Sequence, residues 1–566
     1  MPNHGPALAT SFLVRRRFTL RSISIGIALF AFVGGNLPRA NAAASANPLP
    51  GINDKWQHFK SPNFELYSRN ADKASRQLLY NLELLRGVFL QHMKLKERRR
   101  MEVTVFYFRS EKEFQAYAAP VFSDQSSLAG FYLGHPDRAI ISMAPAEDSD
   151  SAQRVIFHEY VHHLFRVAEY NPPMWYNEGT AEVLAGIQFD GKRVQIGLPV
   201  ENRAAYLSLE QLLPLEQLFA ADPTSKIYTE EKHTGVFYAQ SWALLHFWHF
   251  GKSGFTKEAV DRFLKIAGDR ELAAKIDLQK HFKDSFGCDY AEMLRRLKVY
   301  VRTGSYQYGI QPLPILSPAS SYVSRTVPVD EIGVRLAELA LRVNRTPAGK
   351  LVLLNATKDR PNDPRSFESL GTDAYMEGDV RTATERWEQA LTAGSNNPAV
   401  IRELALVEGR QWFGDFDDSY RLPADATERM RARLLRSIEL EPAQAAAYEM
   451  LAWVEAFAVR PQPANINSVI AQLKEMSDKK QTLIALAMIM LRVGKPEDAA
   501  AMLDHLNTLS LAQKDAYAVA LLQKRLTADH PEVAATSKDS RREVAVEIAP
   551  SGPELKAQSV ALPDDL

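Results

Sequence analysis

The stretch "FHEYVHHLFRVAEYNPPMWYNEGTAEVL", residues 157–184, decides how the first half of this chain folds and what chemistry it can carry. Residues 152–165 around its start contain neither glycine nor proline and are rich in apolar side chains, so they are predicted to be helical. In a helix, residues four apart face the same way, about 6 Å apart along the axis. His158 and His162 can therefore reach one metal ion.

Glu159 lies between the two histidines and is turned about 100° away from His158 by the 3.6-residue helical period. At that angle it faces a water molecule on the metal rather than the metal. This is the placement that a general base for hydrolysis requires.

A hydrolytic zinc site needs a third protein ligand and an open fourth position. Pro172 and Pro173 should end the first helix and start a second one that folds back toward the histidines. Spacing leaves several third ligands open, namely Glu169, Glu178, Glu182 and the neighbouring His163. His163 diverges from His162 by about 100° and is expected to order the site rather than bind the metal.

The motif resembles that of the gluzincin metallopeptidases, the thermolysin-like and aminopeptidase-like clan: "HEYVH" is followed fifteen residues later by "NEG", with a proline and a tryptophan just before it. This resemblance implies zinc (Zn2+) bound by His158, His162 and Glu178. It also implies that Glu182, four residues after the ligand glutamate, accepts a hydrogen bond from the first histidine. Such a carboxylate fixes the tautomer of a ligand histidine.

Tyr238, in "FYAQSW", is a second catalytic candidate besides Glu159. Several gluzincins take a tyrosine or histidine from downstream of the zinc helices to stabilise the oxyanion, and the resemblance implies that role here. The alternative is a core tyrosine on an aromatic helix.

Residues 50–305 combine expected strands with amphipathic helices. Together with the motif, they resemble the peptidase-MA-like domain of exported bacterial proteins, which implies an α+β thermolysin-like zincin catalytic domain. The expected strand at 138–143 is a candidate sheet edge to which a peptide substrate could pair.

The second half of the chain changes character. Residues 306–330 are rich in proline and serine and are predicted to be a linker. Residues 331–530 contain pairs of amphipathic helices, turned at Gly378 and Gly494, that resemble tetratricopeptide repeats. We expect an all-α tetratricopeptide-like solenoid that binds a protein partner. Residues 531–566 have little to bury and are predicted to be a disordered tail.

The composition and the N-terminal residues indicate the size class and the cellular compartment of the protein. The chain has 566 residues, enough for two domains. Residues 1–42 have arginines, a short apolar run and a small-residue cleavage site, as in a signal peptide. We therefore expect an exported protein, periplasmic or secreted, with no stable membrane span after cleavage. Without the five arginines of this segment, 63 basic residues face 68 acidic ones, which gives no case for nucleic-acid binding.

These features predict an exported zinc metallopeptidase whose substrate is a peptide or protein. Two alternatives remain open. One is a tetratricopeptide-like scaffold protein whose zinc domain is structural or latent. The other is zinc-assisted hydrolysis of a bond other than a peptide. An intact Glu159 argues against a purely structural zinc domain, because a structural site has no need of a base.

Overall fold

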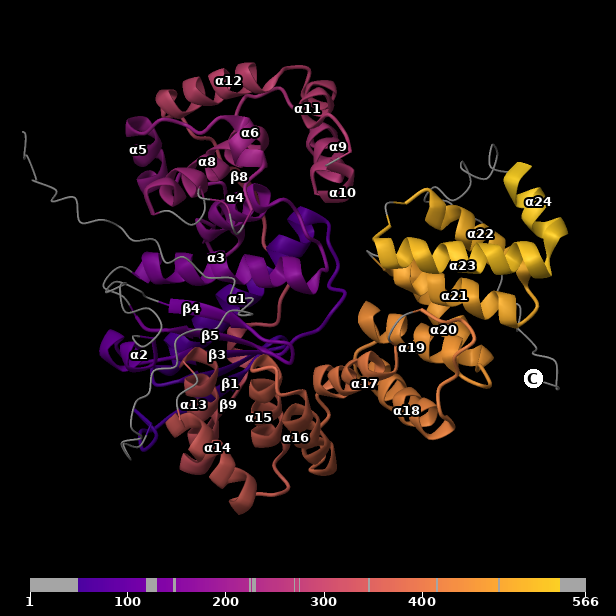
Figure 1. Cartoon of the computed structure of the whole chain (residues 1–566). Helices are drawn as coiled ribbons and strands as arrows, with labels where there is room; N and C mark the ends of the chain where they lie inside the picture. Colours follow the sequence, from indigo (N-terminus) through magenta and orange to yellow (C-terminus); the bar gives the residue numbers. More distant parts are fainter. Residues whose placement is uncertain are drawn as a thin grey trace, which may run out of the picture.

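The computed structural model describes residues 49–539 except 119–129, 146–148, 223–224, 226, 228–230, 269, 274, 345–346, 414–415, 477–478 and 510. These residues are mostly helical, and they include one six-stranded mixed sheet and one three-stranded sheet (Figure 1). The expected signal peptide, residues 1–42, lies outside the described residues. Among the helices that are described, none has the length and apolarity needed to cross a membrane.

The six-stranded sheet has the order β4-β5-β3-β2-β1-β9. Its strands β2, β3 and β5 run parallel, whereas β1, β4 and β9 pair antiparallel with their neighbours. The bounds are β1 (Gln57–Lys60), β2 (Phe64–Ser68), β3 (Val103–Tyr107), β4 (Gly130–Gly134), β5 (Ala139–Met143) and β9 (Val323–Thr326). The central strands are buried on both faces, as parallel strands usually are, so the sheet needs a helical layer on each side.

The first face is covered by α1 (Asp72–Met93) and α3 (Ser149–Val167) (Figure 1). Side chains such as Val105 of the sheet and Leu82 of α1 belong to one continuous core with these helices. α4 (Met174–Ala185) and α8 (Glu231–His249) lie above α3. The remaining helices of this part are α5 (Glu201–Leu209), α6 (Leu215–Phe219), α9 (Lys257–Ala267), α10 (Arg270–Ala273), α11 (Leu278–Phe286) and α12 (Tyr290–Thr303).

α4 and α8 approach each other closely at Gly179, the glycine of the NEG motif. A Cβ at this position would lie 2.6 Å from the carbonyl oxygen of Ser241. A larger residue would therefore push α8 away from α4. The glycine lets α8 lie directly against the helix that carries Glu178.

The second face of the sheet is covered by α2 (Glu111–Ala118) and α13 (Val329–Asn344), and α14 (Pro347–Asp359) packs on α13 (Figure 1). Phe106 and Ile140 of the sheet share a core with Leu336 of α13. The predicted domain boundary at residue 331 is therefore wrong, because the first helices of the expected repeat region complete the core of the sheet. Their amphipathic pattern matches a repeat, but their apolar faces are buried against strands.

The predicted linker, residues 306–330, is also not a free linker. β8 (Gly309–Pro312) joins β6 (Gln188–Phe189) and β7 (Arg193–Ile196) in the three-stranded sheet. β9 then pairs with β1 at one edge of the large sheet, with Thr326 opposite Gln57. The short 3-10 helix η1 (Ala319–Ser321) lies between these strands. The sequence did not predict these strands, because each is short and largely exposed and therefore lacks the run of apolar residues that marks a buried strand.

The strand expected at 138–143 is present as β5, but it is not a sheet edge. It pairs with β3 on one side and with β4 on the other. The hairpin turn at residues 135–137 folds β4 back along β5, which makes β4 the outer strand. This pairing on both sides rules out β5 as the strand to which a substrate could add.

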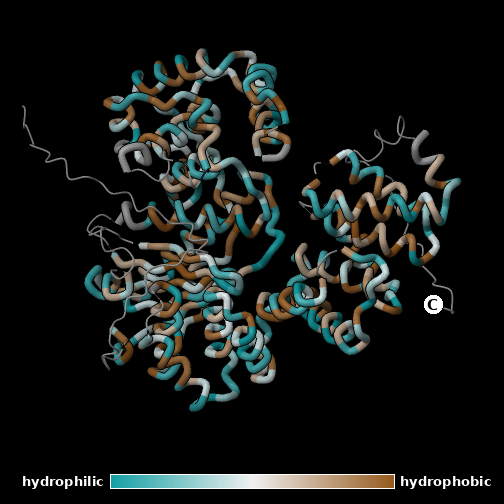
Figure 2. Tube along the Cα trace, in the orientation of Figure 1, coloured by the Kyte–Doolittle hydropathy of each residue, from teal (hydrophilic) through white to brown (hydrophobic). Residues whose placement is uncertain are grey.

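The described residues from 364 to 539 are mostly helical and form consecutive hairpins. Gly378 (φ 82°) turns α15 into α16, and Gly494 (φ 70°) turns α21 into α22, as expected from the sequence. The bounds are α15 (Pro364–Met376), α16 (Val380–Thr392), α17 (Pro398–Trp412), α18 (Ala424–Leu440), α19 (Ala445–Phe457), α20 (Pro463–Gln472), η2 (Leu473–Glu475), α21 (Lys480–Arg492), α22 (Pro496–Asn507) and α23 (Gln513–Asp529). Figure 2 shows both apolar and polar stretches along these helices.

The predicted disordered tail begins too early. Residues 531–539 form α24 (Pro531–Asp539), and Ala534 is buried in the core of the last hairpins. The remainder of the predicted tail, residues 540–566, lies outside the described residues.

Candidate metal centre

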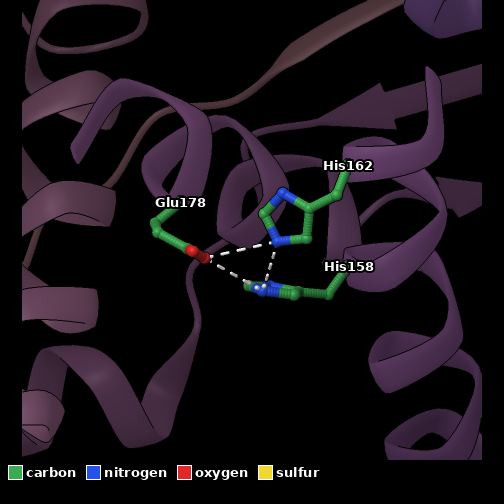
Figure 3. A group of neighbouring side chains, drawn as sticks. All are labelled: His158, His162 and Glu178. Carbon is green, nitrogen blue, oxygen red and sulfur yellow. Dashed lines mark hydrogen bonds and ion pairs between the residues drawn. The ribbon is translucent and has the colours of Figure 1, made fainter. Parts of the chain in front are cut away.

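Three side chains from two neighbouring helices converge at one point (Figure 3). His158 and His162 lie one turn apart on α3, and their Nε2 atoms are 3.2 Å from each other. Glu178 lies on α4, which the proline break turns back across α3. Its Oε2 atom is 3.3 Å from each of the two Nε2 atoms. Within the described residues this is the one group found with the geometry to hold a metal ion.

The dimensions of this triangle fit a zinc ion. Zinc bonds of about 2.0–2.1 Å in tetrahedral geometry place any two ligand atoms about 3.3 Å apart. The three observed separations of 3.2, 3.3 and 3.3 Å match that edge. In addition, Glu178 Oε2 is buried and receives no well-aligned hydrogen bond within the described part of the chain. A carboxylate oxygen and two imidazole nitrogens turned toward one another are a typical donor set for zinc.

The electrostatics of the triangle also favour a cation. Burial would lower the pKa of His162, but the Glu178 carboxylate raises it to about 9. Burial would raise the pKa of Glu178, but His162 and His158 lower it to about 2. The carboxylate thus keeps its negative charge inside the protein by holding a positive charge beside it. A proton on an imidazole provides that charge, and a divalent cation would provide more.

Each of the two histidines has an acceptor near its other ring nitrogen. His162 Nδ1 lies 2.7 Å from Asn177 Oδ1, so the ring donates to the amide and leaves Nε2 free to bind a metal. His158 Nδ1 lies 3.5 Å from Glu182 Oε1, the residue expected at this place from the resemblance. Glu182 also accepts two hydrogen bonds from Arg203, at 2.6 and 3.0 Å.

Sequence reasoning did not single out Asn177 or Arg203. Asn177 carried a usable signal, because it precedes the ligand glutamate in the NEG motif. Arg203 carried none, since it lies on α5 and is brought to Glu182 by the tertiary fold.

Glu159 is buried, with 4% of its surface exposed, and is not part of the ligand triangle. Burial raises the pKa of its carboxyl group, while His158 and His162 act in the opposite direction. It lies close enough to both histidines to interact with them electrostatically. A carboxyl group with a raised pKa is better able to accept a proton in one step and to donate it in the next.

Tyr238 is brought to the site by α8. Its ring centroid lies 6.0 Å from that of His158, and the guanidinium of Arg203 lies 5.8 Å from the centre of the tyrosine ring. The tyrosine side chain is buried. Tyr238 therefore lies in the wall of the candidate metal centre. This position is compatible with a role in stabilising the oxyanion and also with a role as a core tyrosine.

The other candidate ligands do not join the triangle. His163 faces the sheet, where its Nδ1 lies 2.9 Å from the hydroxyl of Tyr132 and its ring stacks on Tyr160. Burial lowers the pKa of His163 to about 3. Glu169 lies just beyond the end of α3 in a left-handed conformation, with φ of 50°.

No protein-family model matches this chain, and no curated protein matches it either. Among solved structures, the chain is similar to a thermophilic TPR protein from Thermus thermophilus. The identity is 18%, the match covers 35% of this chain and 97% of that chain, and the TM-score is 0.20. A score this low supports no argument about fold or function, and none of these results concerns the HEYVH motif.

Proposed function

We propose that this chain is an exported zinc-dependent metallopeptidase of the gluzincin type. The observation that carries the proposal is the triangle of His158 Nε2, His162 Nε2 and Glu178 Oε2, whose edges match those of a tetrahedral zinc site. A buried glutamate directly after the first histidine supports catalysis over a purely structural site. Export is supported by the composition of residues 1–42 alone.

In this proposal the protein's own residues move the protons of hydrolysis. A zinc ion held by the triangle would polarise the scissile carbonyl and lower the pKa of the attacking water. Glu159 takes a proton from that water as its oxygen attacks the carbonyl carbon. Glu159 then gives the proton to the leaving amine nitrogen as the C–N bond breaks. One peptide and one water thus become a carboxylate and a protonated amine, because the second proton of the water also passes to the leaving nitrogen.

The surrounding residues orient this machinery. Asn177 and Glu182 hold the two histidine rings by their Nδ1 atoms, at 2.7 and 3.5 Å. Arg203 holds Glu182 and lies over the ring of Tyr238. The Tyr238 hydroxyl donates to the carbonyl oxygen as negative charge develops on it.

The helical hairpins after the sheet are proposed to bind a protein partner. Support comes from their architecture: helix pairs stacked in sequence build extended surfaces suited to polypeptides. This role and the peptidase role are compatible, since the same chain can present a substrate to its own metal centre.

The test compares three forms of the protein starting at residue 43: wild type, Glu159→Gln and Glu169→Gln. Zinc content and cleavage of casein and of a peptide library are measured for each. We expect about one zinc per chain in all three, with cleavage lost only in Glu159→Gln. Glu169→Gln is the matched control, because Glu169 lies beyond the end of the same helix and outside the ligand triangle.

Two results would contradict the proposal. Zinc binding without cleavage in the wild type would favour the scaffold or latent protein. Absence of zinc from all three forms would remove the metal centre.

A further inference from the structure

Two arginines meet at the turn between β4 and β5. Arg166, in the last turn of α3, lies 3.5 Å from the carbonyl oxygen of His135, and Arg99 donates to the carbonyl oxygen of Pro136. Because these two carbonyl groups are consecutive in the chain, the two guanidinium groups lie side by side. In the described part of the chain, neither arginine forms an ion pair with a carboxylate.

The backbone holds the two arginines in this place. The backbone N–H groups of Arg98 and Arg99 donate to the carbonyl oxygen of Val167 at 2.8 and 2.9 Å, which ties their loop to the end of α3. Gly134, the last residue of β4, leaves room for the guanidinium of Arg166, because a Cβ at that position would overlap it. The two like charges are therefore brought together by the fold.

The nearest acidic groups on the repeat helices are already engaged. Burial, together with the charges of Arg402 and Arg166, lowers the pKa of Arg99 to about 10, while Glu403 and Glu441 oppose this effect. Glu403 is paired with Arg402 at 3.1 Å. Glu441 accepts a hydrogen bond from a backbone N–H in the loop that carries Arg99. Neither glutamate forms an ion pair with Arg99 or Arg166.

Two further carboxylates lie near the pair. Asp137, in the same turn, is paired with Arg138 at 2.8 Å and with Arg342 at 2.7 Å. Glu169 lies beyond the end of α3 and interacts with Arg99 electrostatically, but within the described residues it forms no ion pair. The two arginines thus carry positive charge that no carboxylate of the described structure neutralises by direct contact.

We infer that Arg99 and Arg166 form a binding site for an oxyanion, a carboxylate or phosphate group, at the end of α3. Guanidinium groups bind such anions through two parallel N–H donors. The neutral acceptors at the turn take only part of the five N–H donors of each guanidinium. Both arginines are partly exposed, so an anion can reach them from solvent. The site goes beyond the proposed peptidase function and does not depend on it.

The anion has two possible sources. Arg166 is one helical turn after His162, about 6 Å further along the axis of α3. An extended peptide advances about 3.4 Å per residue, so a peptide at the metal centre needs only a few residues to bring a carboxylate to the arginines. The other source is a free inorganic anion such as phosphate.

The experiment titrates inorganic phosphate into the protein starting at residue 43, in its zinc-loaded and metal-free forms. Sodium chloride keeps the ionic strength constant. Calorimetry gives the affinity, and the Tm with and without phosphate gives an independent measure. Wild type is compared with Arg99→Gln, Arg166→Gln and Arg262→Gln. Arg262 is the control, because it is an exposed arginine on α9 and does not belong to the pair.

We expect wild type to bind a single phosphate per chain in both metal forms. The affinity should fall by about tenfold or more in Arg99→Gln and in Arg166→Gln, the size of one hydrogen bond to a charged group. It should stay unchanged in Arg262→Gln. The rise of Tm with phosphate should follow the same order. Arg99 and Arg166 lie on different segments, so a folding defect in one variant leaves the other as the test.

Peptides separate the two sources of the anion. Amidated peptides that carry glutamate or glutamine at one position at a time are bound to each protein and followed by fluorescence anisotropy. Binding that requires glutamate and Arg166, and that phosphate displaces, supports the site and assigns it to a peptide carboxylate. Phosphate binding that requires Arg166, without any preference for glutamate, supports the site and assigns it to a free anion.

Three results would overturn the inference. Phosphate binding seen only in the zinc-loaded protein would place the anion on the metal. Equal affinity in all the variants would place it away from the two arginines. Absence of phosphate and glutamate-peptide binding in wild type would remove the site. The peptidase proposal is judged separately, by the cleavage assay with Glu159→Gln.

Discussion

Two clusters of mostly buried charged side chains lie on opposite faces of the large sheet, and they differ in how their charges are balanced. The first cluster, called here the junction cluster, joins the β4–β5 hairpin to α13 and α15. Its members are Glu102, Asp137, Arg138, Glu338, Arg342, Arg365 and Glu368. The second is the triangle of His158, His162 and Glu178.

In the junction cluster each arginine forms ion pairs with carboxylates of the same protein. Arg138, which is fully buried, lies 2.8 Å from Asp137 and also contacts Glu368. Arg342 lies 2.7 Å from the same Asp137, and Arg365 lies 2.9 Å from Glu338. Arginines and carboxylates alternate, and each has partners of opposite charge. Such a cluster holds two segments together and needs no ligand.

The triangle lacks this balance. Its carboxylate faces two imidazole nitrogens, and no lysine or arginine makes an ion pair with Glu178 in the described structure. Burial alone therefore does not mark a functional site. A buried cluster whose carboxylates are paired with arginines is structural, whereas a buried carboxylate that no lysine or arginine pairs points to a ligand.

The largest expected effect is on zinc affinity, which should depend on the triangle and not on the junction cluster. Glu178→Gln removes the anionic ligand, and we expect zinc affinity to fall by at least about a thousandfold, one ligand's share of a typical zinc binding free energy. The unfolding free energy of the metal-free protein should also fall, because Glu178 and His162 hold each other in their charged forms inside the protein. Calorimetric titration with zinc and urea unfolding measure the two quantities. Unchanged zinc affinity would exclude Glu178 as a ligand.

The next effect is on stability. Glu338→Gln leaves Arg138 and Arg365 facing a neutral amide in a buried site, and we expect a loss of about 3–5 kcal/mol in the free energy of unfolding. Zinc affinity should not change. Glu331→Gln, on the same helix but in a more exposed pair with Arg325, is the control and should cost about 1 kcal/mol or less. Equal losses in both variants would mean that the junction cluster contributes no special stability.

A smaller effect on zinc affinity is expected from the residues that accept hydrogen bonds from the ligand histidines. Asn177→Ala removes the acceptor for His162 Nδ1, and we expect zinc affinity to fall by about 10–100-fold. Asn63→Ala, which instead breaks a contact with Glu83 far along the sequence from the motif, should leave zinc affinity as it is. Competition with a chromogenic chelator measures both. A similar affinity in the two variants would remove Asn177 from the metal centre.

The smallest effect is a pH dependence at His135, which lies next to the junction cluster. Burial lowers the pKa of His135 to about 3, and the arginines at 342, 166 and 138 add to that effect while Asp137 opposes it. The unfolded chain takes up this proton near pH 6.5, so stability contributed by neutral His135 is present above pH 6.5 and is lost as pH falls toward 3.

The expected loss from His135 is at most about 1.4 kcal/mol per pH unit in that window. Urea unfolding at pH 7.5 and 5.5 measures it in wild type and in His135→Asn, which should show a smaller drop. An identical drop in the two proteins would place the pH dependence elsewhere.

Much of the candidate metal centre was predictable from local sequence. The helix around HEYVH, the break at Pro172 and Pro173, and the second helix carrying Glu178 were all expected, and the structure contains them. These features depend on helical period and proline geometry, which act over a few residues. The choice between Glu178 and Glu182 came from family resemblance, because spacing allowed both.

The boundary between the two halves was not predictable in the same way. Helix α13 has the pattern expected of a repeat, and residues 306–330 have the composition of a linker. What places them against the sheet is burial of Phe106 and Ile140 on its second face and pairing of β9 with β1. Strand pairing between residues more than 250 positions apart leaves no local trace.

By itself, the sequence determined the chemistry available to this protein: two histidines one helical turn apart, a glutamate beside them and helices of defined length. Hydrogen bonding along a helix is local, so those properties follow from neighbouring residues. The tertiary structure decided which carboxylate lies against the two histidines and which arginine binds Glu182. It also decided in which cluster the carboxylates are paired with arginines. Such contacts depend on the packing of whole elements, because only the folded core brings distant side chains within a few ångströms of each other.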